Sequence, residues 1–257
     1  MILTLDIGNT HIKIGLYEGD RMAQYWRMAT NRAYTSDEYG TKLENMFNHS
    51  QTPLNTVKGI IISSVVPTIN YTIEHMCRDF YKITPIFVGP GIKTGLNLKY
   101  ENPRELGADR ICNAVAAATL YGTPCITIDF GTATTFNVIS GQGAFLGGCI
   151  LPGMKVASEA IVQNAARLPL FELSKPEKVI GRTTVTNLQS GMIYGYVGQV
   201  EYLIRRMKEE MGEGDIKVIA TGGFSNLITG ETDVIDKIDG RLTLKGLKII
   251  YDKNADK

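Results

Sequence analysis

The stretch Ile2-Leu3-Thr4-Leu5-Asp6-Ile7-Gly8-Asn9-Thr10, followed by the alternating run Ile12-Lys13-Ile14-Gly15-Leu16-Tyr17, reads as two strands joined by a tight turn. The same order of residue types returns at Cys125-Ile126-Thr127-Ile128-Asp129-Phe130-Gly131-Thr132-Ala133-Thr134, which Thr135-Phe136-Asn137-Val138-Ile139 follows. Each turn begins with Asp, an apolar residue and Gly. The two aspartates are 123 residues apart in a chain of 257, so the spacing predicts a duplicated architecture of two lobes.

The elements predicted after each hairpin also correspond, which a single shared turn would not require. In the first half we expect helices at 36–48 and 67–81 and strands at 59–66 and 85–88. In the second half we expect two long helices, a strand, a short helix and a final strand, at 153–166, 186–211, 216–220, 223–227 and 247–251. Helices that alternate with strands after an antiparallel hairpin predict an α/β fold with a mixed sheet in each lobe. Ligands are expected between the lobes.

A helix is expected to link the two lobes. Asn102-Pro103-Arg104-Glu105 offers an N-cap residue, Pro at the first helical position and Glu at the third, so the helix is expected to open there and to run through Ala118. Gly107 weakens its first turn. We place the domains at 1–105 and 106–257, with the linking helix near 106–121 and Asp109 and Arg110 in its first two turns.

Composition excludes several classes of protein. Lys and Arg number 27 against 26 Asp and Glu, and no basic stripe is present, so a nucleic-acid-binding surface is not expected. No apolar run, the one at 59–62 included, approaches the roughly 18–20 residues that span a membrane. The N-terminal residues do not read as a signal-type leader, so none is expected, and the four cysteines are widely spaced. We therefore expect a cytoplasmic protein with reduced, buried thiols.

The two Gly-containing turns have the chemistry of a polyphosphate site. Glycine lets backbone N–H groups approach a phosphate closely, and Asn and Thr side chains supply further donors, at Asn9, Thr10, Thr132, Thr134 and Thr135. Asp6 and Asp129 would repel a bare phosphate, so their presence indicates intervening cations such as Mg²⁺. The alternative is that Asp-x-Gly marks two ordinary β-turns without a ligand.

A third segment, Val218-Ile219-Ala220-Thr221-Gly222-Gly223-Phe224, is an apolar strand that ends in a pair of glycines. Ligands bind at the carboxyl ends of strands in α/β sheets, so the Gly pair is a candidate for a nucleoside contact. The alternative is a plain strand-to-helix turn. The chain contains neither a P-loop nor a dinucleotide-binding fingerprint.

Together these motifs resemble the two phosphate motifs and the adenosine motif of the acetate and sugar kinase, heat-shock chaperone and actin superfamily, which has a duplicated ribonuclease-H-like (actin-like ATPase) fold. Within it, the chain closely resembles type III pantothenate kinases. Three further segments look like that family's signatures in the family's order: Gly107-Ala108-Asp109-Arg110, Gly147-Gly148-Cys149-Ile150-Leu151-Pro152-Gly153 and Ile180-Gly181-Arg182-Thr183-Thr184.

The resemblance implies ATP-dependent phosphorylation of pantothenate, the first step of coenzyme A biosynthesis. It implies that the ATP phosphates bind to Asp6, Ile7, Gly8, Asn9, Thr10, His11, Ile12, Lys13 and Thr132. Asp129 matches the site for a monovalent cation, K⁺ or NH₄⁺, and Asp6 is assigned to the metal site of the ATP turn. The substrate contacts would be Tyr100, Gly107, Ala108, Asp109, Arg110 and Thr184, with Asp109 as the general base.

Phosphoryl transfer independently suits these assignments. It depends on positioning and charge neutralisation, and one aspartate that accepts the hydroxyl proton late in the transfer is sufficient. Arg110 would neutralise either a substrate carboxylate or the transferring phosphoryl group. The alternative for Asp109 and Arg110 is a solvated surface ion pair. Thr183 stands where the family more often has Asn or Ser, which leaves the substrate contact open between Thr183 and Thr184.

The long helix predicted at 186–211 carries Gly191, Gly195 and Gly198 on nearly one face. Each glycine costs a helix about 1 kcal/mol relative to Ala, so close packing of another helix is expected to offset the cost. That helix would belong either to the same chain or to a second copy. Since the resembled family is dimeric, we favour a homodimer.

Two other functions agree with the same motifs. Transcriptional accessory factors that share the fold would bind nucleotide without useful kinase activity; the intact Gly107–Arg110 segment and the lack of a basic face argue against them. A kinase for another small hydroxylated substrate, such as a sugar, would use the same nucleotide-binding parts, because one fold hosts many substrates.

Overall fold

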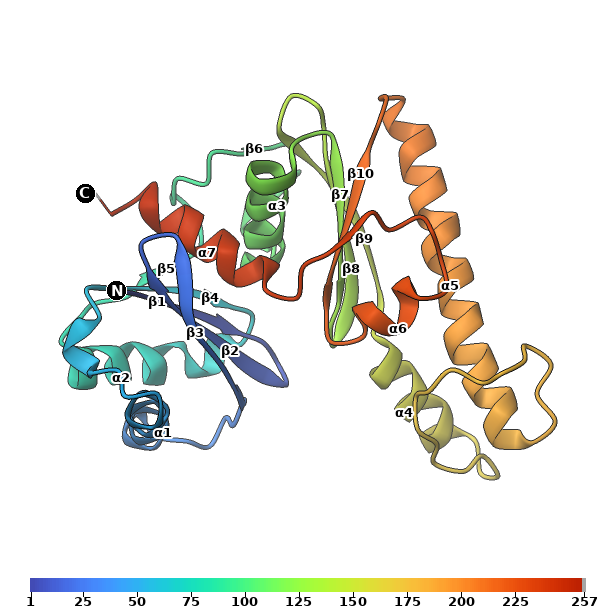
Figure 1. Ribbon diagram of the computed structural model, residues 1–257, viewed down its shortest axis with the longest axis horizontal. Coiled ribbons are helices and arrows are strands. Elements are labelled where there is room, and N and C mark those ends of the chain that lie inside the picture. The colour runs from blue at the N-terminus through green and yellow to red at the C-terminus, as the bar shows by residue number, and fades with distance from the viewer. Residues whose placement is uncertain (256–257) are drawn as a thin grey trace. The chain divides into compact units, whose positions relative to one another are not determined.

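A computed structural model describes residues 1–255 (Figure 1). The chain forms two compact units, each built from more than one segment. The first unit contains Met1–Gly95, Glu101–Ala116 and the chain from Leu242 onward. The second contains Leu96–Tyr100 and Ala117–Arg241. No helix among the described residues is long and apolar enough to cross a membrane.

The first unit is built on a five-stranded mixed sheet with the strand order β3-β2-β1-β4-β5. Its strands are β1 (Ile2–Ile7), β2 (His11–Glu18), β3 (Arg21–Ala29), β4 (Gly59–Ser64) and β5 (Ile86–Phe87). Neighbours β1 and β2 are antiparallel, as are β2 and β3, whereas β4 lies parallel to β1 and β5 parallel to β4. The hairpin predicted at the N-terminus is confirmed and extends into a three-stranded meander.

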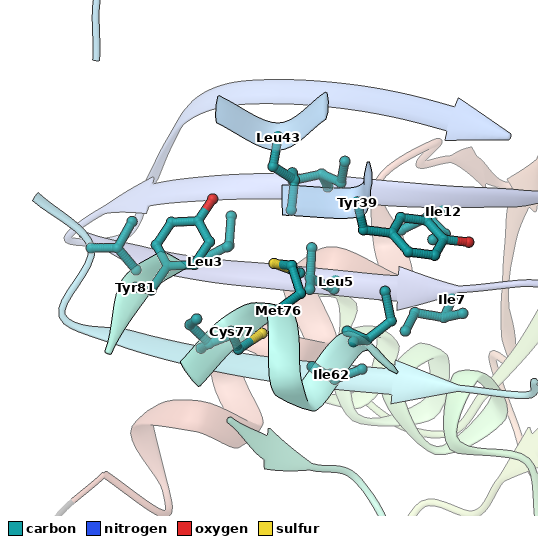
Figure 2. Close-up of a cluster of buried hydrophobic side chains, with 14 of the residues drawn as sticks. Leu3, Leu5, Ile7, Ile12, Tyr39, Leu43, Ile62, Met76, Cys77 and Tyr81 are labelled. Atoms are coloured by element: carbon teal, nitrogen blue, oxygen red, sulfur yellow. The ribbon is translucent and has the colours of Figure 1, made fainter. Parts of the chain in front are cut away.

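Alternate residues of β1 face opposite sides of this sheet. Leu3, Leu5 and Ile7 point into an apolar core with α1 (Ser36–His49) and α2 (Asn70–Tyr81), as Figure 2 shows. Thr35 and Glu38 form a capping box that begins α1, and a 3₁₀ turn (Pro67–Ile69) precedes α2. A further 3₁₀ turn, Leu54–Thr56, leads into β4. This face of the sheet is therefore covered by α1 and α2.

The opposite face of the first sheet carries Thr4 and Asp6 and is covered by α7 (Leu242–Asp252). A Cβ added to Gly15, which pairs with Thr4, would lie 3.4 Å from the Leu244 side chain. The first part of α3 (Ala108–Tyr121) belongs to the same unit. Gly246 of α7 lies so close to α3 that an added Cβ would be 2.0 Å from the Cys112 carbonyl oxygen.

The contact at Gly246 leads to a stability prediction. Gly246→Ala would force two helical backbones apart, and overpacking of this kind costs about 1–3 kcal/mol of the free energy of unfolding. We expect a lower Tm in calorimetry. Gly89→Ala is the matched control, because a Cβ at Gly89 meets no atom within 4 Å. An unchanged Tm for Gly246→Ala would contradict the close α3–α7 packing.

The second unit repeats this plan in a six-stranded mixed sheet, β11-β10-β7-β8-β9-β6. Its strands are β6 (Asn97–Leu98), β7 (Cys125–Phe130), β8 (Ala133–Ile139), β9 (Ala144–Pro152), β10 (Lys217–Gly222) and β11 (Lys237–Ile238). The order 9-8-7-10-11 matches 3-2-1-4-5 of the first unit, and β6 is an addition at the edge. The predicted duplication is therefore confirmed.

The helices of the second unit are α4 (Met154–Asn164), α5 (Thr184–Met211) and the short α6 (Ser225–Thr229). Ile128 and Phe130 of β7 share a buried core with Ile193 and Val200 of α5. Asp129, between them on β7, points to the other face of the sheet. In both units the aspartate of the Gly-containing turn thus lies near the end of a central strand. Because side chains alternate between the two faces of a strand, the residues directly before and after each aspartate point into the core.

Two sequence-based expectations are wrong. The segment 247–251 was expected to be a strand, but it lies inside helix α7. Its buried residues Leu244, Leu247 and Ile250 follow a helical spacing, and a short apolar run does not distinguish a helix from a strand. The linking helix was expected to begin near residue 102, but Asn102 caps a 3₁₀ turn, Pro103–Glu105, and α3 begins only at Ala108.

The division of the chain also differs from the predicted boundary at residue 105. Helix α7 returns to the first unit because its buried residues pack on β1, β2 and β4. The segment Leu96–Tyr100 joins the second unit because β6 pairs with β9. Helix α3 contributes its residues up to Ala116 to one unit and its residues from Ala117 to the other. A contiguous two-domain division misses these exchanges, since it follows only chain order.

Candidate functional site

The turn between β1 and β2 is held by hydrogen bonds from three segments. Its own Gly8 N–H donates to the His11 carbonyl oxygen (3.0 Å), and Val65 N–H, just after β4, donates to Ile7 O (3.0 Å). Thr30, just after β3, donates twice: its N–H to Thr10 O (3.0 Å) and its hydroxyl to Gly8 O (2.6 Å). The turn is therefore fixed before any ligand arrives, as a phosphate-binding turn requires.

Asp6 and Lys13 face each other across the β1–β2 ladder, at the base of this turn. The Lys13 Nζ lies 3.4 Å from Asp6 Oδ2, and the side chains are 25% and 7% exposed. The carboxylate thus offsets much of the lysine charge at the turn. A triphosphate bound here would need further positive charge from a cation or another side chain.

Asp109 stands in the first turn of α3, where its carboxylate is held in place by the backbone. The Arg110 N–H donates to Asp109 Oδ1 (2.8 Å), and a Cβ at Gly107 would lie 2.6 Å from the same oxygen. The helix N-terminus favours the negative charge. Gly107 thus leaves the space that the Asp109 carboxylate occupies.

The Arg110 side chain is only 6% exposed. The alternative interpretation of a solvated surface ion pair is therefore wrong for this arginine. Buried charges are kept in proteins when they are paired, so Arg110 belongs to a structured polar region rather than to a free surface.

Cys112 is a buried thiol close enough to Asp6 and Asp109 to feel the charge of both. It is completely buried and follows Asp109 by one helical turn. Burial raises the pKa of Cys112 well above its usual value, and the negative charges of Asp6 and Asp109 raise it further. The thiol therefore stays protonated. The sequence predicted only a buried cysteine, although its position three residues after Asp109 on a helix was the available signal.

In the second unit, Asp129 and Thr221 occupy paired positions at the ends of β7 and β10, so both side chains lie on one face of the sheet. Thr221 is 1% exposed, and its hydroxyl has no hydrogen-bond partner within residues 1–255. Gly222 follows with a φ of +96°, and a Cβ there would lie 2.6 Å from Asp129 Oδ1. A carboxylate beside a buried, unsatisfied hydroxyl is a donor set that fits a hard cation.

The turn after β7 is supported by the start of α4. Gly153 N–H donates to Thr132 O (3.1 Å), and a Cβ at Gly153 would lie 2.3 Å from that oxygen. The hydroxyl of buried Tyr196 on α5 donates to Pro152 O (2.7 Å) and lies 2.6 Å from the Thr134 hydroxyl. These contacts explain the Pro152-Gly153 signature, and they leave the Thr132 side chain exposed at the tip.

The remaining predicted substrate residues divide between the units. Gly107, Ala108, Asp109 and Arg110 lie in the first unit, and Tyr100 and Thr184 lie in the second. The Tyr100 ring contacts Phe145 edge-on at 6.1 Å between centroids. Thr183 caps α5, because its hydroxyl accepts from Thr186 N–H (3.1 Å), whereas Thr184 is exposed in the first turn. Of the two threonines, Thr184 is thus the one whose side chain the cap does not use.

A hollow of about 380 Å³ lies in the second unit beside the Gly pair that ends β10. Phe224, which directly follows Gly223, lines it together with residues of α4 and with the chain from Leu170 to Leu173. Two aromatic and three aliphatic side chains line it beside one serine and three charged residues, a mixture that suits a flat, partly apolar group such as a nucleoside base. Within residues 1–255, no group of three or more His, Cys, Asp or Glu side chains is placed to hold a metal ion.

Comparison with known proteins places these observations in a family. Residues 2–206 match a family model described as type III pantothenate kinase. A Campylobacter jejuni protein described as a Baf family transcriptional activator is 21% identical, with a TM-score of 0.63 and coverage of 99% of this chain and 100% of that one. A Sinorhizobium meliloti protein described as a 2-dehydro-3-deoxygalactonokinase is 10% identical, with a TM-score of 0.62 and coverage of 99% and 97%.

The inorganic polyphosphate/ATP-glucomannokinase of Arthrobacter sp. strain KM is 10% identical, with a TM-score of 0.53 and coverage of 100% and 99%. At these identities the likeness concerns the fold alone. The fold is the duplicated α/β architecture of actin-like ATPases and sugar kinases, as the sequence predicted.

Proposed function

Because the chain belongs to the type III pantothenate kinase family, whose members are phosphotransferases, we propose that it transfers the γ-phosphoryl group of ATP to the primary hydroxyl of pantothenate. One observation carries the proposal. Asp6 of the phosphate turn and Asp109 of α3 belong to the same unit, and the charge of each raises the pKa of Cys112, which supports a shared site for the proposed ATP turn and the proposed base. The product would be 4′-phosphopantothenate, and the reaction the first step of coenzyme A biosynthesis.

In this proposal the ATP phosphates bind to the turn from Asp6 to Lys13 and to Thr132. Tyr100, Thr184 and the segment Gly107–Arg110 contact pantothenate. Asp109 accepts the hydroxyl proton late in the transfer, and its carboxylate is already oriented by the Arg110 N–H at 2.8 Å. Preorganisation of this kind lowers the barrier because no rearrangement is needed as the reaction proceeds.

The residues fit two kinds of cation. Asp6, nearly buried beside the phosphate turn, suits Mg²⁺, which proteins hold through one or two carboxylates, water and phosphate oxygens. Asp129 and the unsatisfied Thr221 hydroxyl offer oxygen ligands for K⁺ or NH₄⁺. When bound, such cations would neutralise negative charge on the nucleotide.

The test is a direct assay of the purified chain with ATP, Mg²⁺ and K⁺. We expect pantothenate to be converted to a product 80 Da heavier by mass spectrometry, and we expect its kcat/KM to exceed those of a panel of sugars and other hydroxylated substrates. A sugar with a higher kcat/KM would favour the sugar-kinase alternative, which has the same fold.

The transcriptional accessory alternative requires a binding experiment. In the presence of a non-hydrolysable ATP analogue, pantothenate at 100 times its Kd should stabilise the protein by about 2.7 kcal/mol and raise its Tm. Nucleotide binding without any response to pantothenate would favour the accessory factor.

A homodimer through α5 is part of the proposal. Gly191, Gly195 and Gly198 are exposed, and a Cβ at each would meet no atom within 4 Å. The expected packing of this stripe within the chain is therefore absent from residues 1–255. The remaining explanation for three costly glycines on one face is a second copy.

Gly195→Leu is expected to convert the dimer to a monomer, because a large side chain would keep two closely packed helices apart. Sedimentation velocity over a concentration series measures the change. Lys208→Leu adds the same side chain to α5 away from the stripe and should leave the dimer intact. A wild-type monomer, or a dimeric Gly195→Leu variant, would contradict the proposal.

A further inference from the structure

Arg32 lies at the phosphate turn, although no sequence motif drew attention to it. It stands in the exposed loop after β3, and its Nη2 donates to the Asn9 side-chain Oδ1 at 3.1 Å. Asn9 is at the tip of the turn proposed to hold the ATP phosphates. The guanidinium has five N–H donors, and this contact uses one of them.

The loop that carries Arg32 is held by the two residues that directly precede the arginine. Thr30 is bound to the phosphate turn through Thr10 O and Gly8 O. Asn31 is bound to Tyr39 of α1, whose hydroxyl donates to Asn31 O (2.8 Å) and accepts from Asn31 N–H (3.1 Å). A loop fixed in this way presents its arginine at small cost in conformational entropy.

Tyr39 is a rigid anchor for this loop. It is completely buried, and its ring contacts Tyr34 edge-on at 5.4 Å between centroids. Burial raises the pKa of the Tyr39 hydroxyl, so the hydroxyl stays protonated and can donate to Asn31 at any physiological pH. The loop also closes on itself, because Ala33 N–H donates to Asn31 Oδ1 (3.0 Å).

The charges of the side chains at the turn indicate a role for Arg32 in phosphate binding. Lys13, the other cation of the turn, lies 3.4 Å from Asp6 and is largely offset by it. Arg32 forms no ion pair with a described Asp or Glu residue, so its charge at the turn is not offset. Guanidinium groups bind phosphate through two parallel N–H donors, which suits the end of a polyphosphate.

We propose that Arg32 binds the β- or γ-phosphate of ATP directly and, through Asn9, fixes the side chain at the tip of the turn, with Tyr39 as the residue that positions the loop. The inference rests on the proposed function, since it assumes that ATP binds to the Asp6–Lys13 turn. It adds a phosphate-binding residue outside the family motifs given above.

The test measures nucleotide binding by calorimetry in the presence of Mg²⁺ and the absence of pantothenate. Arg32→Gln should weaken ATP binding by about 10- to 100-fold, the range for a lost charge-assisted contact of about 1.5–3 kcal/mol, and should leave AMP binding unchanged. Arg32→Lys should recover part of the affinity. Tyr39→Phe should raise the KM for ATP with little change in kcat, because it loosens the loop and removes no reacting group.

Arg78→Gln is the matched control. Arg78 also lies in the first unit but pairs with Glu74 on α2 at 2.6 Å, so its loss should not alter ATP binding. Wild-type affinity in Arg32→Gln, or an equal loss in Arg78→Gln, would overturn the inference while leaving the proposed function standing. Failure of the wild-type chain to bind ATP would overturn both.

Discussion

Asp109→Asn is expected to lower the kcat of pantothenate phosphorylation by about 10²- to 10⁴-fold, the range typical of a lost general base. The amide oxygen of Asn can still accept from Arg110 N–H, as Asp109 Oδ1 does at 2.8 Å, so the start of α3 is preserved. What is lost is the ability to take up a proton at neutral pH. A coupled ADP-release assay, with Tm measured in parallel, separates the chemical effect from unfolding.

Two further variants sharpen this prediction. Asp109→Ala removes both the base and the acceptor at the helix start, so it should lose activity to a similar degree and also lower the Tm slightly. Glu105→Gln is the matched control, because Glu105 is an exposed carboxylate in the preceding 3₁₀ turn, with Asn102 as its partner at 2.6 Å. If Asp109→Asn retained near wild-type kcat, Asp109 would not be the base.

The second large effect concerns the cation site. We expect Asp129→Asn to abolish activation by K⁺ or NH₄⁺, because a monovalent cation loses its charged ligand. Thr221→Val should weaken the activation by about 10- to 100-fold, as loss of one supporting group around a metal does. Activity titrated with KCl against a constant ionic strength of NaCl measures both effects.

Thr221→Val should give a combination of results that a purely structural role of the Thr221 hydroxyl would not give. Valine has nearly the shape of threonine, and the Thr221 hydroxyl has no hydrogen-bond partner among the described residues. Removing a buried, unsatisfied hydroxyl should therefore leave the Tm of the cation-free protein unchanged or raise it. The rise in Tm that K⁺ causes in the presence of ATP should nevertheless shrink. Thr221→Ser keeps the hydroxyl and should behave like the wild type.

Two results would contradict the cation assignment. One is equal turnover in Na⁺ and K⁺ buffers for the wild type. The other is an undiminished K⁺ response in Thr221→Val, which would remove Thr221 from the site and leave Asp129 to be tested alone. A loss of Tm in cation-free Thr221→Val would show that the hydroxyl supports the fold instead.

Much of the fold could be predicted from the sequence because its signals are local. Alternating apolar residues that end in Asp-x-Gly fix a strand and its turn, and their repetition 123 residues later fixes the duplication. The helix start after Thr35 was also accessible, since capping depends on side chains three residues apart, whereas α5 begins at Thr184 and was expected from about Thr186. Predictions failed where local signals were ambiguous, as at 247–251, where the apolar run fits either a strand or a helix.

By itself, the sequence determined which residues stand at the two turns and that Asp109 lies in a helix, because these features depend on neighbours along the chain. Only the tertiary structure decided that the charges of Asp6 and Asp109 both act on Cys112, that Thr221 lies beside Asp129, and that Arg32 reaches Asn9. Those relations depend on strand pairing and on loops folded back over the sheet. They join residues up to about a hundred positions apart, and no local pattern encodes such distances.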